Sequence, residues 1–235
     1  MPYLKVNDIN LYYERSGAGQ PLVFINGLSS DISDWTGFIM MLSRKYEVIA
    51  IDNRGAGRSD KPYVPYSIEM MAGDTAGILD TLKVKNANIL GLSMGGRIAV
   101  ALALSRPELV KSLVLVSTRM GRAERRGWRS RLRLNVSLRF RARGSEKYPQ
   151  RFYAFKRQWE ASGDYDATAR LCEIHVPTLI LHGNDDKLVP YKFAQEINEG
   201  IEGSKIINFE GEHLFFIGHF REFIEAIFEF LGSVK

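Results

Sequence analysis

The chain has 235 residues, of which 45% are hydrophobic and 25% charged, and its net charge is +5. This balance predicts a folded globular protein of one or two domains and excludes an extensively disordered chain. No apolar run approaches the ~20 residues that cross a bilayer, and the first residues lack the pattern of a signal peptide, so we expect a cytoplasmic protein. The one cysteine, Cys172, excludes an internal disulfide, and we interpret it as a buried apolar filler.

The first part of the chain predicts a hairpin followed by two strands of a different kind. Apolar alternation about the turn-like pair Asn7-Asp8 indicates the hairpin. The two later runs are continuously apolar, as in strands that a parallel sheet buries on both faces, and a helix is expected between them. These elements are strands at residues 4–6, 9–13, 21–26 and 46–51 and a helix containing residues 35–42.

A glycine-rich turn follows the last of these strands. It reads DNRGAGRS over residues 52–59, where glycines permit a tight turn that Asp52 and Arg54 can brace. We interpret this motif as structural, with direct substrate contact as the lesser alternative. Ser67 is then the expected N-cap of a helix, because apolar residues recur at helical spacing over residues 68–82 and predict packing on the sheet.

The chain is organised around residues 88–104, NILGLSMGGRIAVALAL. A short apolar run leads into a glycine-rich turn and good helix formers follow, so we expect a strand that turns sharply into a helix with Ser93 at the turn. Gly91 and Gly95 avoid the crowding that side chains would cause where helix and strand approach. The first N–H groups of the helix then point toward the spot where Ser93 presents its hydroxyl.

This Gly-x-Ser-x-Gly turn between a strand and a helix resembles the nucleophile elbow of the α/β-hydrolase fold serine hydrolases, which include esterases and enol-lactonases. The resemblance implies an α/β fold with a mostly parallel central sheet flanked by helices. It also implies a Ser, Asp, His triad in that chain order, and an oxyanion hole whose N–H groups come from Leu28 and Met94. Where the family's oxyanion loop often begins His-Gly, this chain has Asn26-Gly27, as enol-lactonases tend to have.

Regular alternation of strand and helix stops after a strand expected at residues 110–117. Residues 118–167 are rich in arginine and aromatic residues. They resemble the small inserted cap of many α/β-hydrolases, with residues 1–117 and 168–235 as the core domain. Apolar and polar residues alternate over residues 131–143, which alone predicts a strand. Because family caps are usually helical, and arginine and leucine are good helix formers, we favour a helix.

Charge is divided unevenly along the chain. Residues 119–157 hold 14 lysines and arginines against two acids, a net +12, whereas the remainder carries −7. Three partners are open for this basic segment: the acidic remainder of the chain, an anionic substrate steered toward Ser93, or an anionic polymer or membrane surface. Our preferred functional interpretation is that the basic segment steers an anionic substrate toward Ser93. The structural alternative is that the segment forms a solvated face of the protein. Nucleic acid is disfavoured because no nucleic-acid fold is recognised.

The acid of the expected triad follows a strand predicted within residues 176–183. The sequence there reads HGNDDKLVP and resembles the family's acid loop, Gly-x-x-Asp-x-x-Val-Pro. Alignment on Gly183 and on the Val-Pro pair selects Asp186 rather than Asp185. A helix near residues 193–201 is expected next.

The base is expected just after a strand at residues 205–209. His213 lies where the family places this histidine, although Glu212 stands where the family prefers a small residue. His219 is therefore the rival. A final amphipathic helix is expected over residues 219–231. Its apolar face carries Phe220, Phe223, Ile224, Ile227, Phe228 and Leu231.

Together these residues predict nucleophilic catalysis at Ser93. The imidazole of His213 takes the proton of the serine hydroxyl, and the Asp186 carboxylate orients that imidazole and stabilises its charged form. We therefore expect a cofactor-free hydrolase that cleaves a small-molecule carboxylic ester or lactone through an acyl-enzyme. His175 and His182 show no metal-ligand spacing and are assigned structural roles.

Two alternative functions stay open. Residues 25–35, INGLSSDISDW, and residues 91–96, GLSMGG, resemble the corresponding loops of enol-lactonases, which favours an enol-lactonase or a carbon–carbon bond hydrolase of the same fold. The alternative from another class is a non-catalytic, ligand-binding member of the fold. Such proteins often lose a triad residue, whereas this chain retains a candidate for each.

Overall fold

The computed structural model describes residues 2–122 and 147–234 of the chain. Strands and helices alternate over most of this length. The strands are β1 (Tyr3–Val6), β2 (Ile9–Ser16), β3 (Pro21–Ile25), β4 (Glu47–Ile51), β5 (Ala87–Leu92), β6 (Val110–Val116), β7 (Thr178–Gly183) and β8 (Lys205–Phe209). The α-helices are α1 (Thr36–Leu42), α2 (Ile68–Thr81), α3 (Met94–Ser105), α5 (Phe152–Asp164), α6 (Lys192–Gly200) and α7 (Phe220–Ser233), and short 3₁₀ helices lie at Ile32–Trp35, Pro107–Leu109, Thr168–Glu173 and Phe215–Ile217.

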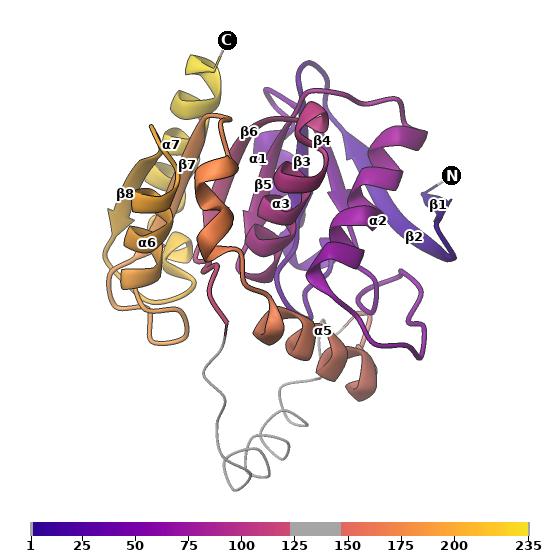
Figure 1. Cartoon of the computed structure of the whole chain (residues 1–235). Helices are drawn as coiled ribbons and strands as arrows, with labels where there is room; N and C mark the ends of the chain where they lie inside the picture. The colour runs from indigo at the N-terminus through magenta and orange to yellow at the C-terminus, as the bar shows by residue number, and fades with distance from the viewer. Residues whose placement is uncertain (1, 123–146, 235) are drawn as a thin grey trace, which may run out of the picture.

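The strands form one eight-stranded sheet with helices on both faces (Figure 1). Their order is β1-β2-β4-β3-β5-β6-β7-β8. The β1–β2 and β2–β4 pairs are antiparallel, and every pair from β4–β3 to β7–β8 is parallel. The sheet therefore has the mostly parallel architecture that the resemblance implied. Among the described residues, no helix combines the length and the apolar character needed to cross a bilayer.

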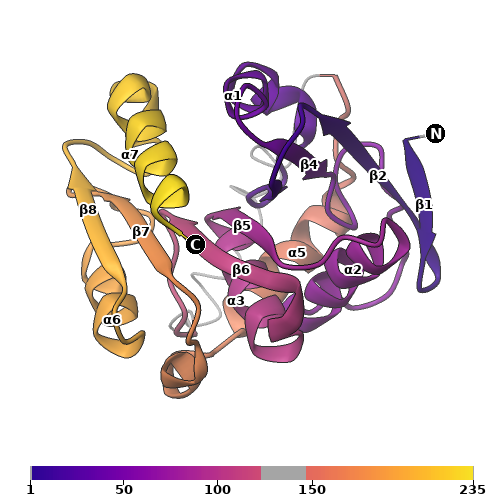
Figure 2. The same cartoon turned by 90° about the horizontal axis from the view of Figure 1, so that it is seen from above.

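Successive side chains of each strand point to opposite faces of the sheet, so the core is divided into two layers. In β3, Leu22 and Phe24 belong to one layer, and Val23 and Ile25 belong to the other. Helices α1 and α7 cover the first layer, and α2, α3 and α6 cover the second (Figure 2). Burial on both faces explains why the sequence of β3 is continuously apolar.

Helix α2 begins where the N-cap pattern predicts. The hydroxyl of Ser67 accepts a hydrogen bond from Met70 N–H at 3.0 Å, which satisfies one of the donors that a helix start leaves without an intrahelical partner. The buried face of α2 includes Ile68, Met71 and Ile78. The predicted cap and the predicted packing on the sheet are both confirmed.

The glycine-rich turn after β4 is held by buried charges. The carboxylate of Asp52 accepts hydrogen bonds from Ile32 N–H at 2.8 Å and from Arg58 N–H at 2.9 Å. Arg54 is buried against Asp74 of α2 and donates to it through both Nε and Nη2. The motif therefore braces three segments of the chain, as a structural role requires, but Asp52 and Arg54 take separate partners: Asp52 pairs with Arg58 of the same motif, and Arg54 pairs with Asp74.

The final helix differs in part from its predicted face. Four of the six predicted apolar positions are buried, Phe228 is half-buried and Phe220 is 38% exposed. Phe230, which the prediction omitted, is buried. It lies three residues after Ile227 and therefore falls on the same helical stripe.

Cys172 is not the buried filler that the sequence suggested, because its side chain is exposed. It lies in the 3₁₀ helix Thr168–Glu173, in which the neighbouring Leu171 is buried in the core. With about three residues per turn, adjacent positions of such a helix point in different directions, so Leu171 takes the inward position and Cys172 faces solvent.

The predicted cap, residues 118–167, is described only at its two ends, and the alternating run at residues 131–143 lies outside the described residues. Helix α5 belongs to the second end. It lies at the carboxyl ends of β3 and β4, because Gln158 Oε1 accepts from Ser29 N–H, after β3, at 3.1 Å and Gln158 Nε2 donates to Arg54 O, after β4, at 2.7 Å. Tyr153 also donates its hydroxyl to Lys61 O at 2.5 Å. We propose that α5 is part of a cap over this edge of the sheet.

Arg97 of α3 joins both ends of this segment to the core. Its guanidinium is buried and donates to Gly121 O at 3.0 Å, to Ser162 O at 2.5 Å and to Tyr165 O at 3.2 Å. Burial, together with the charge of Arg119, lowers the pKa of Arg97 to about 10. The group stays cationic at neutral pH and meets the carbonyls at the carboxyl end of α5, where the helix dipole favours a positive charge.

Candidate active site

Ser93 lies at the turn between β5 and α3, where the sequence placed it. Its backbone has φ 53° and ψ −112°, a left-handed φ that costs a non-glycine residue roughly 1–3 kcal/mol. The neighbouring glycines make room for this turn. A Cβ on Gly91 would lie 2.6 Å from the carbonyl carbon of Gly95, and a Cβ on Gly95 would collide with Ile25 O. The strained turn presents the Ser93 side chain at the end of the sheet.

Asp186 is the acid that the structure brings to the site. Its Oδ2 lies 2.7 Å from His213 Nδ1, and its Oδ1 accepts hydrogen bonds from Leu188 N–H and Val189 N–H, both at 2.8 Å. The carboxylate is buried, whereas Asp185 is exposed. The geometry therefore agrees with the motif alignment in selecting Asp186.

Opposing effects set the pKa of Asp186. Burial raises the pKa and is the largest single effect, but hydrogen bonds from His182, His213 and Val189 N–H together hold the pKa well below its usual range. His182 is itself fully buried, and its Nε2 lies 2.8 Å from Val189 O and 3.4 Å from Asp186 Oδ2. Asp186 is consequently a carboxylate at neutral pH, as the partner of an imidazole must be.

His213 completes the hydrogen-bonded row, because its Nε2 lies 3.1 Å from Ser93 Oγ. The rival, His219, sits at the start of α7 with its ring 5.8 Å from the ring of Phe209. The structure thus brings Ser93, Asp186 and His213 together and leaves His219 in an aromatic contact.

These three side chains meet because each follows the carboxyl end of a strand, and the carboxyl ends of parallel strands share one edge of a sheet. The strands are β5, β7 and β8, and β6 lies between the first two. The loop that carries His213 approaches β7 so closely that a Cβ on Gly183 would lie 2.5 Å from Glu212 O. The glycine of the acid-loop motif is therefore required by this close approach.

Two hydroxyl residues at the end of β6 were missed by the sequence analysis. Ser117 donates its hydroxyl to His213 O at 2.9 Å, and Thr118 donates its hydroxyl to Ser93 O at 2.7 Å. They tie the backbones of Ser93 and His213 to the strand between β5 and β7. Their position in the sequence could have indicated these roles, because both residues directly follow a predicted buried strand, and that strand comes next in the chain after the elbow.

The loop after β3 lies beside Ser93. A Cβ on Gly27 would be 3.6 Å from the Ser93 Cβ and 3.4 Å from Leu92 O. Leu28 follows in this loop, and Met94 is the first residue of α3, where a backbone N–H has no partner within the helix. Both predicted oxyanion-hole residues therefore belong to segments that adjoin Ser93.

Asn26, which stands where the family often has histidine, braces this loop. Its Nδ2 donates to Ile51 O at 2.8 Å, and its backbone carbonyl accepts a hydrogen bond from Asn53 Nδ2 at 3.0 Å. The side chain is fully buried. Both contacts tie the start of the oxyanion loop to the end of β4 and to the turn that follows β4.

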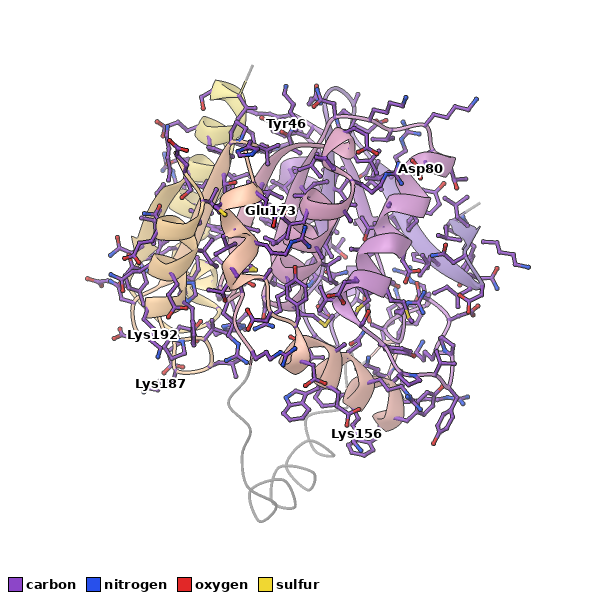
Figure 3. All side chains as sticks on the ribbon, in the orientation of Figure 1. Tyr46, Asp80, Lys156, Glu173, Lys187 and Lys192 are labelled. Carbon is purple, nitrogen blue, oxygen red and sulfur yellow. The ribbon has the colours of Figure 1, made fainter. Side chains whose placement is uncertain are left out.

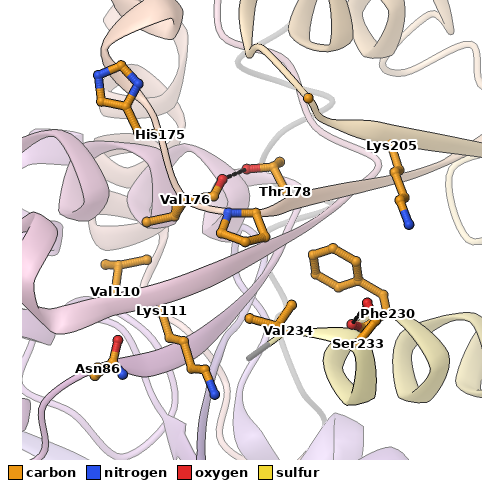
Figure 4. Close-up of a pocket in the computed structure, with 12 residues that line it drawn as sticks. Asn86, Val110, Lys111, His175, Val176, Thr178, Lys205, Phe230, Ser233 and Val234 are labelled. Carbon is orange, nitrogen blue, oxygen red and sulfur yellow. Dashed lines mark hydrogen bonds between the residues drawn. The ribbon is translucent and has the colours of Figure 1, made fainter.

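A cavity of about 560 Å³ lies elsewhere in the molecule (Figure 4). Val110, Thr178 and Lys205, which line it, are the first residues of β6, β7 and β8. It therefore opens at the amino ends of the strands, at the opposite edge of the sheet from Ser93. Within residues 2–122 and 147–234, no group of three or more His, Cys, Asp or Glu side chains is arranged to hold a metal ion.

Comparison with known proteins decides the family. Residues 20–135 match the family model of the alpha/beta hydrolase fold. The putative carbamate hydrolase RutD of Azorhizobium caulinodans is 31% identical over an alignment that covers 100% of this chain and 99% of that protein. The chain belongs to the α/β-hydrolase family.

Solved structures of other α/β-hydrolases agree with this assignment. A hydrolase from Pseudomonas aeruginosa has 25% sequence identity and a TM-score of 0.89, with 98% of each chain covered. The enol-lactonase from Burkholderia xenovorans LB400 has 27% identity and a TM-score of 0.84, covering 99% of this chain and 100% of that one. The predicted fold, a mostly parallel sheet flanked by helices, is confirmed, and the chain is an enzyme of the α/β-hydrolase family.

Proposed function

We propose that the chain is a serine hydrolase that cleaves carboxylic esters or lactones through an acyl-enzyme. The proposal is supported by a hydrogen-bonded series of three side chains. Ser93 Oγ lies 3.1 Å from the His213 imidazole, which lies 2.7 Å from the Asp186 carboxylate. A serine hydroxyl is a weak nucleophile at neutral pH, and an imidazole within hydrogen-bond reach can take its proton during attack.

The proposed reaction has two steps. Ser93 Oγ attacks the carbonyl carbon while its proton passes to His213 Nε2, and collapse of the tetrahedral intermediate expels the alcohol, which takes that proton. Water then attacks the acyl-enzyme, with His213 again accepting the proton and returning it to Ser93 Oγ. With a lactone the leaving oxygen stays attached to the acyl group, so the single product is a hydroxy acid. Asp186 stays ionised throughout and stabilises the imidazolium.

The oxyanion of each tetrahedral intermediate needs hydrogen-bond donors that stabilise its negative charge. We assign this role to the backbone N–H groups of Leu28 and Met94, since Gly27 adjoins Ser93 and Met94 follows it at the start of a helix. Removal of one such donor in a serine hydrolase typically lowers kcat by about 10²- to 10³-fold.

An enol-lactone is the second candidate substrate, and a specific observation favours it. The match to an enol-lactonase covers 99% of the chain, and Asn26 takes the place of the histidine that often opens the oxyanion loop. The same two steps apply, because an enol-lactone is a cyclic ester whose leaving group is an enolate. Turnover of p-nitrophenyl esters of graded chain length, measured beside an enol-lactone, separates the two substrate classes. Hydrolysis of a carbon–carbon bond is the remaining catalytic alternative.

Covalent labelling tests the proposal directly. A fluorophosphonate probe should add one adduct mass to the intact protein, on the peptide that contains Ser93, because only an activated serine reacts readily with such a probe. Ser93→Ala should abolish the adduct, with intact mass spectrometry as the measurement. Labelling that survives this substitution would reject Ser93 as the nucleophile, and the absence of any adduct on the unsubstituted protein would favour a non-catalytic, ligand-binding protein.

We further propose that the substrate is anionic and is steered by the basic segment. This segment includes the described Arg122, Arg151 and Arg157, and it also includes Lys156, which lies on α5 at the lower edge of the molecule and is about half exposed (Figure 3). Salt screens exposed charges beyond ~10 Å at 0.1 M. The kcat/KM of a carboxylate-bearing ester should therefore fall as ionic strength rises, whereas that of a neutral ester of equal size should change little.

Stopped-flow or steady-state rates at several NaCl concentrations provide this measurement. Parallel salt profiles for the charged and the neutral ester would contradict steering. Sedimentation of the protein with anionic liposomes, but not with neutral ones, would assign the basic segment to a membrane surface instead.

A further inference from the structure

Helix α5 reaches the oxyanion loop, residues 27–30, through a buried amide. Gln158 is fully buried, and its Oε1 accepts a hydrogen bond from Ser29 N–H at 3.1 Å. The same oxygen accepts from Gln150 Nε2 at 2.9 Å, and Gln158 Nε2 donates to Arg54 O at 2.7 Å. Since the Ser29 N–H is a donor and the Arg54 carbonyl an acceptor, these partners fix which end of the amide carries the oxygen.

The backbone at Ser29 is one that needs support from its surroundings. Ser29 has φ 66°, in the left-handed region, although it is not a glycine. Such a conformation persists in a non-glycine residue where neighbouring structure holds it. The Ser30 N–H to Gly27 O contact within the loop is long, at 3.4 Å. The hydrogen bond from Ser29 to Gln158 is the shorter restraint, and it comes from a residue 129 positions away in the chain.

A second contact between α5 and the loop lies next to the first. Phe155, one turn before Gln158, is buried and packs against Leu28. Residues three apart on a helix share one face, so α5 presents an aromatic ring and an amide to consecutive residues of the loop. One contact holds the side chain of Leu28, and the other holds the peptide group that joins Leu28 to Ser29. Figure 1 shows α5 crossing below the sheet.

We propose that Gln158 is a positioning residue for the oxyanion hole. By holding the Leu28–Ser29 peptide it fixes the backbone of Leu28, and thereby the direction of the Leu28 N–H, which belongs to the preceding Gly27–Leu28 peptide and points toward the substrate oxygen. This inference rests on the proposed function. It makes the geometry of the oxyanion hole depend on the position of α5, so that the helix we propose as part of the cap also takes part in assembling the site. Gln158 itself touches neither the substrate nor the reacting atoms.

The test compares two single substitutions in α5. Gln158→Leu removes the acceptor for Ser29 N–H with little change in volume. Tyr153→Phe is the matched control, because it removes one hydrogen bond that anchors the same helix, to Lys61 O, and leaves the oxyanion loop untouched. For ester hydrolysis, Gln158→Leu should lower kcat by about 10- to 100-fold with KM changed less than about threefold, since a misplaced donor is felt mainly in the transition state. Tyr153→Phe should stay within about threefold of the unsubstituted enzyme in both constants.

Two further readouts separate positioning from general loss of structure. Binding of an aryl boronic acid, which forms a tetrahedral adduct with an anionic oxygen, should weaken in Gln158→Leu by the same factor as kcat. Hydrogen exchange of the peptide spanning residues 26–30 should accelerate in Gln158→Leu and not in Tyr153→Phe. Gln158→Glu keeps an oxygen facing Ser29 N–H and should retain more activity than Gln158→Leu. If the leucine variant folds poorly, the glutamate variant supplies the test.

Unchanged exchange at residues 26–30 in Gln158→Leu would overturn the inference whatever the activity. Equal losses of kcat in Gln158→Leu and Tyr153→Phe would also overturn it, because they would show only that α5 must be docked. Failure of the unsubstituted protein to react at Ser93 is a different result. It would reject the proposed function, and with it the oxyanion role, while the exchange data would still establish whether Gln158 holds the loop.

Discussion

Replacement of His213 by alanine is expected to lower kcat for ester hydrolysis by about four to six orders of magnitude. The imidazole Nε2 lies 3.1 Å from Ser93 Oγ, and within residues 2–122 and 147–234 no other basic side chain is hydrogen-bonded to that oxygen. Loss of the general base in serine hydrolases has effects of this size, because the nucleophile and the base act as one unit. Steady-state kinetics on a p-nitrophenyl ester, with active-site titration of the enzyme concentration, provide the measurement.

His219→Ala is the matched control for this prediction. Its ring lies against Phe209 at the start of α7, so its removal should change kcat by less than about threefold and act mainly on stability. A severe loss in His219→Ala together with a mild one in His213→Ala would move the base to His219 and contradict the geometry of the site.

Asp186→Asn is expected to lower kcat by about 10⁴-fold. Each carboxylate oxygen accepts two contacts, Oδ1 from Leu188 N–H and Val189 N–H and Oδ2 from His213 and His182. An amide must turn its NH₂ group toward one of these donor pairs, so it either loses the backbone contacts or forces His213 into the wrong tautomer. The effect of this change in a serine triad is of the stated order. Asp185→Asn, at the exposed neighbouring position, should leave kcat within about threefold, and the opposite pattern would assign the acid to Asp185.

The same substitution has a signature in the pH dependence of stability. Because the folded protein holds the pKa of Asp186 below its usual range, the ionised carboxylate stabilises the fold above the unfolded value of about 3.9, and this contribution is lost as pH falls toward the folded value. The unfolding free energy of the unsubstituted protein should therefore decline more steeply below about pH 4 than that of Asp186→Asn. Urea titrations at pH 7, 4 and 3 measure this difference, and parallel declines would contradict it.

Most of the regular structure outside residues 118–167 could be predicted because its signals are local. The run at residues 205–209 forms β8 with the bounds expected, and Ser67 caps α2 as its pattern indicated. The elbow could also be placed, since Gly91 and Gly95 are needed by contacts within a few residues of Ser93 and by the approach of β3. The prediction for Cys172 failed because it rested on residue type alone. Cysteine is common in protein cores, but this cysteine lies on the solvent-facing side of a 3₁₀ helix.

In the candidate site, too, local motifs could be predicted from the sequence, whereas contacts between distant residues could not. Motif alignment selected Asp186 and His213, yet both rivals satisfied the chain order that the family requires, and it is the distances of 2.7 and 3.1 Å that distinguish them. The partner of Arg54 could not be foreseen, because Asp74 becomes its neighbour only when α2 packs beside the turn after β4. Ser117 and Thr118 acquire their roles in the same way, from the position of β6 between β5 and β7.

The sequence by itself determined the position of the elbow, because that depends on a pattern a few residues long that constrains the backbone directly. Through its resemblance to the α/β-hydrolases, the same motif also indicated the class of fold and the kind of chemistry to expect. Only the tertiary structure decided which side chains meet. Ser93 and His213 are 120 residues apart, and Ser29 and Gln158 are 129 apart. No local pattern encodes such contacts, since they arise from the order of the parallel strands and from the docking of α5 on their carboxyl ends. The packing of distant segments therefore sets the geometry on which the proposed reaction depends.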